Sequence, residues 1–155
     1  MARWLALVAF LVFTPQAEAG LRFDGSAPSR PYQTWINETV KVDKPDGVLW
    51  LYEDSYCPAC FIWQDPPEIH LGPGSRNQRV FYHELGHAYH YFHPSFQWAF
   101  YAKGWGGPGI SQNELIAETY KACALGGKKY LGYGYWPDVT PKSFNSACWL
   151  LRKGA

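Results

Sequence analysis

The amino-acid sequence predicts a single domain of the α+β class, in which a small sheet backs two helices. Its 155 residues are enough for one domain with a core of its own and too few for two comfortable ones. Short apolar and aromatic runs next to turn residues predict strands in the first half of the chain. Two longer segments with helix-start signals follow them. A small sheet covered by helices is an α+β arrangement.

Residues 1–19 have the three parts of a secretory signal peptide. A basic start is followed by a run of nine apolar residues and by a small-residue pattern that ends at Ala19. We therefore expect cleavage before Gly20 and secretion of one domain, 20–155, whose first part, 20–30, is a loose leader. An uncleaved membrane anchor is the poorer interpretation, because the apolar run is too short to cross a bilayer.

Turn and capping residues delimit the expected elements. The second long helix begins after Ser111, with Glu114 three residues later as in a capping box, and it stops at Gly126. Three short strands would form the sheet. The predicted strands are 48–52, 61–63 and 68–71, and the predicted helices are 32–40, 77–91, 112–125 and a short one near 143–151.

Four cysteines in an exported chain predict disulfides, because the extracellular environment is oxidising. Of the three possible pairings we favour Cys123 with Cys148, which would tie the C-terminal segment to a helix, and Cys57 with Cys60 as a local bridge. The alternative for Cys57 and Cys60 is half of a structural zinc site or a redox pair. The sequence contains no second CxxC that would complete a four-cysteine zinc site.

The main chemical signal is the pattern HExxH at His83, Glu84 and His87. Two histidines four residues apart lie on one face of a helix, so both imidazoles can bind the same metal ion. Neutral imidazole is a good ligand for Zn²⁺, and a catalytic zinc site keeps one position open for water. The pattern therefore predicts one catalytic Zn²⁺ held by His83 and His87, with Glu84 as the base that activates a zinc-bound water.

A third protein ligand is needed, and the sequence offers two sources for it. Glu114 and Glu118 are four residues apart on the second long helix, so they share a face that can dock against the motif helix. One would bind the zinc, and the other would hold a ligand histidine by its second ring nitrogen. The rival is His93, which fits the metzincin spacing HExxHxxGxxH, although His90 replaces the glycine and no internal methionine is present for a Met-turn.

At these residues the chain resembles the gluzincins, and most closely the minimal metallopeptidases that are similar to the catalytic domain of anthrax lethal factor. Their HExxH helix is followed by a helix of the form ExxAE with an aromatic residue next, and Glu114-Leu-Ile-Ala-Glu118-Thr-Tyr120 has this form. The resemblance covers roughly 77–123. It implies a minimal zincin fold, with Glu114 as the zinc ligand and Glu118 as the carboxylate behind it.

The resemblance also implies a tyrosine that stabilises the transition state, seven residues before the ligand glutamate. Gly107 occupies that position here. Three other tyrosines are candidates for the oxyanion donor: Tyr101 in the segment between the two helices, and Tyr133 and Tyr135 in the C-terminal part of the chain.

These observations together predict a hydrolase, namely a secreted, monomeric, zinc-dependent endopeptidase that acts on a peptide or protein substrate. A net charge of +1 without a cluster of Lys and Arg in the sequence argues against a nucleic-acid partner, and no segment after the signal predicts a membrane partner. The alternatives are a zinc amidase that acts on cell-wall peptides and a non-catalytic secreted module, held together by zinc or by disulfides alone.

Overall fold

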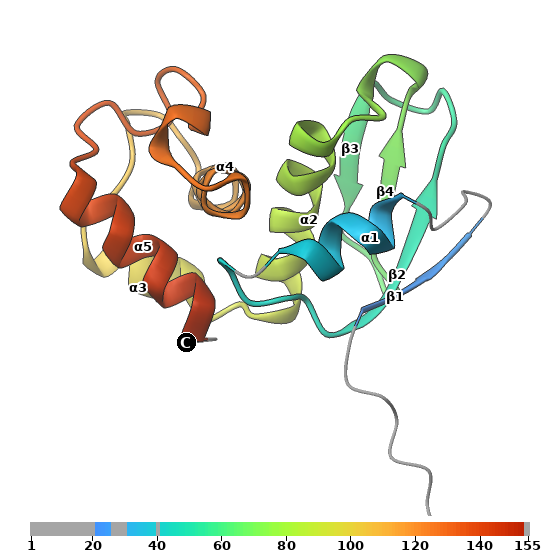
Figure 1. Cartoon of the computed structure of the whole chain (residues 1–155), viewed down its shortest axis with the longest axis horizontal. Helices are drawn as coiled ribbons and strands as arrows, with labels where there is room; N and C mark the ends of the chain where they lie inside the picture. The colour runs from blue at the N-terminus through green and yellow to red at the C-terminus, as the bar shows by residue number, and fades with distance from the viewer. Residues whose placement is uncertain (1–20, 26–30, 40, 154–155) are drawn as a thin grey trace, which may run out of the picture.

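The computed structural model describes residues 21–25, 31–39 and 41–153, and it has the expected α+β composition (Figure 1). The predicted signal peptide and its cleavage site lie outside the described residues. Helix α2 lies between the sheet on one side and helices α3, α4 and α5 on the other (Figure 1). No helix of the described part of the chain is both long enough and apolar enough to span a membrane.

The sheet has four strands in the order β1-β2-β4-β3. Strands β1 (Leu21–Asp24), β2 (Gly47–Tyr52) and β4 (Glu68–Leu71) run parallel, whereas β3 (Ala59–Ile62) pairs with β4 in the antiparallel direction and forms one edge. Alternate residues of β2 and β4 face the helices, as a period of two requires. The fully buried side chains of these two strands are Leu49, Leu51, Ile69 and Leu71.

The N-terminal strand β1 corrects the expectation of a loose leader and of a three-stranded sheet. Residues Leu21 to Asp24 pair with Gly47 to Trp50 of β2. Leu21 is also part of the buried core. For this part of the segment 20–30 the prediction of a loose leader is wrong, because a pairing partner more than twenty residues away decides whether so short a segment is a strand.

Helix α2 (Gln78–Phe92) is the central element of the molecule. Asn77 caps its start by accepting a hydrogen bond from the backbone N–H of Val80, 3.1 Å away. Its first turn packs on the short helix α1 (Tyr32–Glu38). The ring centroids of Tyr32 in α1 and Phe81 in α2 are 4.8 Å apart. Two 3₁₀ turns, Pro73–Ser75 before α2 and Lys128–Tyr130 after α4, complete the connections.

Helix α4 (Gln112–Leu125) packs on α2 more extensively than any other element does. As expected, Ser111 caps it, accepting a hydrogen bond from the Glu114 N–H, and Gly126 ends it in the left-handed conformation with φ of +89°. Helices α2 and α4 approach each other closely at Gly86. A Cβ there would lie 2.6 Å from Ala117 Cα, so only glycine allows this helix separation.

Two further helices cover the other side of α4. Helix α3 (Phe96–Ala102), which the sequence did not predict, buries Phe96 and Phe100. Helix α5 (Pro141–Lys153) is longer at both ends than the predicted segment 143–151. Thr140 and Ser143 exchange hydrogen bonds at its start, which explains why the helix begins two residues earlier than predicted.

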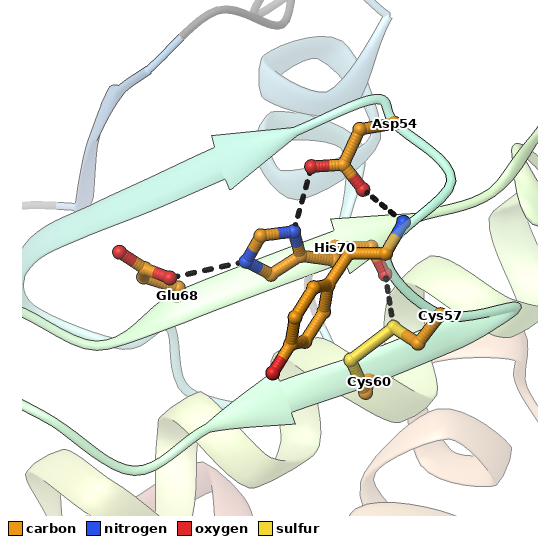
Figure 2. Close-up of a disulfide and its surroundings, with 6 residues drawn as sticks. Asp54, Cys57, Cys60, Glu68 and His70 are labelled. Carbon is orange, nitrogen blue, oxygen red and sulfur yellow. Dashed lines mark hydrogen bonds and ion pairs between the residues drawn. A yellow bond between two sulfur atoms is a disulfide. The ribbon is translucent and has the colours of Figure 1, made fainter.

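Both favoured disulfides are present. Cys123–Cys148 joins α4 to α5, and Cys57–Cys60 closes the turn before β3. Because Cys57 and Cys60 are bonded to each other, the alternative that they form half of a zinc site is wrong for this structure. Figure 2 shows this bridge beside His70 of β4. The His70 ring lies between two carboxylates, with Nδ1 2.8 Å from Asp54 and Nε2 3.0 Å from Glu68. The contact with Asp54 ties the turn to the sheet.

Candidate metal centre

Three predicted ligand residues meet where α2 faces the first turn of α4. The ligand atoms of His83, His87 and Glu114 all lie within 4.8 Å of one another. One carboxylate oxygen of Glu114 is 3.3 Å from Nε2 of His83, and the other is 3.4 Å from Nε2 of His87. Two imidazole nitrogens and a carboxylate that face one point could hold a metal ion.

The local sequence explains this convergence. The cap at Asn77 starts α2, and the spacing of four places the two histidine rings on one face, with centroids 5.0 Å apart. Gly86 lets α4 approach closely, with Ala117 against it. Ser111 fixes the start of α4 three residues before Glu114, so the carboxylate stands in the first turn, opposite the histidines.

Glu84 is buried beside this group, with 5% of its surface exposed. Burial raises the pKa of its carboxyl to about 7, and the negative charge of Glu114 acts in the same direction, while the charge of His83 opposes the rise. A carboxyl group with a pKa near neutrality exchanges protons readily at physiological pH. Glu84 therefore has the properties of a general base and acid.

Glu118 holds His83 from behind. Its Oε2 is 2.9 Å from Nδ1 of His83, so a proton on this nitrogen points to the carboxylate, and Nε2, which faces Glu114, is the nitrogen that could bind a metal ion once it is deprotonated. The other oxygen of Glu118 accepts hydrogen bonds from the Lys121 ammonium and from the Gly132 N–H. Burial alone would raise the pKa of Glu118. The hydrogen bonds from His83, Lys121 and Gly132, together with the charge of Lys121, outweigh this effect and lower the pKa.

Neither Lys121 nor Gly132 was predicted from the sequence as part of the site. Lys121 had a usable signal, because it stands three residues after Glu118 on the same helix and a pair of opposite charges at this spacing is favourable. Gly132 had none, since only the tertiary fold brings its N–H to the carboxylate.

His87 is a neutral imidazole in this environment. Burial lowers its pKa to about 3, and the neighbouring charges of His83 and His90 act in the same direction. Among the described residues its buried Nδ1 has no hydrogen-bond partner, while its Nε2 faces Glu114. A neutral imidazole with one nitrogen turned toward two other potential ligand residues, here His83 and Glu114, fits metal ligation.

The structure does not bring His93 to this group. His93 ends α2 as its C-cap residue, and its ring packs on Tyr89, with centroids 4.6 Å apart. His90 continues the helix, and no non-glycine residue in the described ranges has a positive φ. The helix therefore does not break where the metzincin spacing would require it, and the metal group that the described residues form contains Glu114 instead.

Of the three candidate tyrosines, the structure places Tyr135 beside the metal centre. Its ring centroid is 6.4 Å from that of His83, and burial, followed by the charges of Glu114 and Glu118, raises the pKa of its hydroxyl. Tyr101 and Tyr133 are 71% and 107% exposed.

The backbone of Tyr135 occupies the space next to Gly107. The Gly107 N–H donates to the Tyr135 carbonyl at 2.9 Å, and a Cβ on Gly107 would overlap the carbonyl oxygen of Gly134. A tyrosine at position 107 is therefore excluded by the same segment that brings Tyr135 to the centre.

No protein-family model, no curated protein and no solved structure matches the chain. Its chemistry is therefore inferred from the residues around the metal centre and their geometry.

Proposed function

We propose that the protein is a secreted, zinc-dependent endopeptidase of the gluzincin type. The observation that carries this proposal is the meeting of His83, His87 and Glu114 within 4.8 Å beside the buried Glu84. Three protein donors leave a fourth position open, as catalytic zinc sites do and structural sites do not. Two disulfides are compatible with an oxidising compartment, where we place the protein.

His83, His87 and Glu114 would hold the zinc ion, which when bound would polarise the substrate carbonyl and lower the pKa of a water molecule. Glu84 accepts a proton from the attacking water and delivers it to the leaving amine, roles that suit a carboxyl with a pKa of about 7. Glu118 keeps His83 in the tautomer and orientation needed for ligation.

Tyr135 is the residue that we assign to the developing oxyanion. A raised pKa keeps its hydroxyl protonated, so it can donate a hydrogen bond to the negative oxygen that forms on the substrate. Its position beside His83 puts this donor close to the metal ligands.

The edge strand β3 supplies a way to bind an extended peptide. It is the last strand of the sheet, and within the described residues only β4 pairs with it. Its Phe61 ring stacks on His87, with centroids 6.0 Å apart, so the strand lies next to a metal ligand. A substrate that pairs with β3 by strand addition would therefore pass the metal centre.

The test is cleavage of a mixed peptide library by zinc-loaded wild type and by Glu84→Gln, with the zinc content of both measured. We expect wild type to cleave, and Glu84→Gln to retain zinc while its rate falls by roughly 10²- to 10⁴-fold, because the variant lacks the base. Equal cleavage by both would contradict the role of Glu84. A zinc-loaded wild type that cleaves neither library peptides nor cell-wall peptides would favour a non-catalytic zinc module.

A further inference from the structure

A second site lies at the opposite end of α4, in a pocket of about 360 Å³ between α4 and α5. Its floor is apolar, because the buried ring of Phe144 and the Cys123–Cys148 disulfide line it. Three cationic side chains from segments far apart in the sequence stand around it: Lys41, Lys128 and Arg152. None of the residues that line it is acidic.

These cations are not neutralised within the described part of the chain. None of its ion pairs involves Lys41, Lys128 or Arg152, and the one hydrogen bond of the Lys128 ammonium goes to the neutral carbonyl of Val139 at 3.4 Å. The ten residues that line the pocket include these three basic side chains and no acidic one. The pocket thus lies in a locally positive region.

Gly126 makes room for one of these charges. A Cβ at this position would overlap the Lys41 ammonium, so the glycine that ends α4 also lets Lys41 reach the pocket. The disulfide and the left-handed turn at Gly126 hold in place the walls that α4 and α5 contribute to the pocket. A preformed apolar pocket with a few converging polar groups is the usual form of a small-molecule site.

From these observations we propose that this pocket binds an organic anion, that is, a ligand with an apolar body and a carboxylate, sulfonate or phosphate group. The apolar body would contact Phe144 and the disulfide, and the anionic group would pair with Lys41, Lys128 and Arg152. The site is separate from the metal centre, because Gly126 and Glu114 lie at opposite ends of α4, about 18 Å apart along its axis at 1.5 Å per residue. The inference therefore does not depend on the proposed peptidase function.

The probes are 2-naphthoate and its neutral analogue 2-naphthamide, which differ in the charge of one group. Each is titrated into ¹⁵N-labelled protein with both disulfides formed, and the backbone amide shifts of Gly126, Gly127, Lys128 and Asn145 are followed. We expect 2-naphthoate to move these resonances in a saturable way and 2-naphthamide to bind at least about tenfold more weakly, because the amide lacks the charge. Raising the salt concentration should weaken only the naphthoate.

The variants distinguish specific binding of naphthoate in this pocket from general attraction of an anion to positive charges on the protein surface. Lys41→Gln and Arg152→Gln should each weaken naphthoate binding by about three- to tenfold, and the double variant by more than about tenfold. Lys44→Gln is the matched control, because it removes the same charge from an exposed residue outside the pocket and should change binding by less than about twofold. All are exposed positions, and thermal unfolding verifies that each variant is folded.

Three results would overturn the proposal. If naphthamide binds as tightly as naphthoate, the pocket recognises apolar groups and not anions. If Lys44→Gln weakens binding as much as Lys41→Gln, the attraction is general and no specific site exists. If naphthoate, up to its solubility limit, shifts none of the four amides, the pocket does not bind this class of ligand.

Discussion

Replacing Gly86 with alanine tests whether the close approach of α2 and α4 sets the geometry of the metal centre. The new Cβ would lie 2.6 Å from Ala117 Cα and 2.8 Å from its carbonyl oxygen. Both are backbone atoms, so α4 must move by about 0.8 Å to restore an ordinary contact. Overpacking of this kind costs roughly 1–3 kcal/mol, and the better helix propensity of alanine offsets about 1 kcal/mol. We expect a net loss of about 0–2 kcal/mol in the free energy of unfolding.

The same displacement carries Glu114 away from the two histidines. Metal–ligand distances tolerate changes of only about ±0.2 Å, so we expect zinc affinity to fall by at least about tenfold. The assays are urea unfolding of the metal-free protein and zinc titration against a chromophoric chelator. Gly74→Ala is the control, because a Cβ there meets no atom within 4 Å. Equal unfolding free energies and equal zinc affinities for Gly86→Ala and Gly74→Ala would refute this prediction.

Three further predictions concern the groups around the centre and the joint between α4 and α5. Glu118→Gln should lower zinc affinity by roughly 10- to 100-fold in the chelator titration, because the ligand histidine loses a charged partner; unchanged affinity would contradict the role of Glu118. Tyr135→Phe should lower kcat by about 10²-fold with zinc retained, whereas the exposed control Tyr133→Phe should leave kcat unchanged; equal kcat values would remove Tyr135 from the mechanism. Removing the Cys123–Cys148 bridge, which spans 25 residues, by a double substitution to alanine should cost about 3.5 kcal/mol in urea unfolding; a loss below about 1 kcal/mol would mean that packing alone holds α5.

The sequence predicted the elements whose signals are local. Helix α4 is an example, since its cap at Ser111 and its stop at Gly126 are both encoded within a few residues and both are present in the structure. The two disulfides were predicted as well, because four cysteines allow only three pairings.

Elements that depend on distant partners were missed. Strand β1 is only four residues long and is defined by its pairing with β2. Helix α3 is seven residues long, and the burial of its aromatic rings, which no local signal reveals, stabilises it.

In the metal centre, too, some features follow from local sequence signals and others depend on distant partners. The spacing of His83 and His87 was sufficient to place them together, because a helix has a fixed period. The resemblance implied Glu114 as the third ligand and left His93 as a rival, and the packing of α4 on α2 brings Glu114 to the two histidines. Among the three tyrosines the sequence offered no choice, and the packing of the C-terminal segment places Tyr135 beside His83. The pocket between α4 and α5 could not be predicted from the sequence, because its three cationic residues are spread from Lys41 to Arg152 and only the fold brings them together.

The central claim is that His83, His87 and Glu114 bind one zinc ion. Its most direct test is the zinc content of wild type, Glu114→Ala and His93→Ala, measured by atomic absorption after gel filtration in the presence of a weak chelator. The account predicts one zinc per wild-type chain, one in His93→Ala, and almost none in Glu114→Ala, because two histidines alone do not complete a site. Zinc retained by Glu114→Ala and lost by His93→Ala, or no zinc in the wild type, would contradict it.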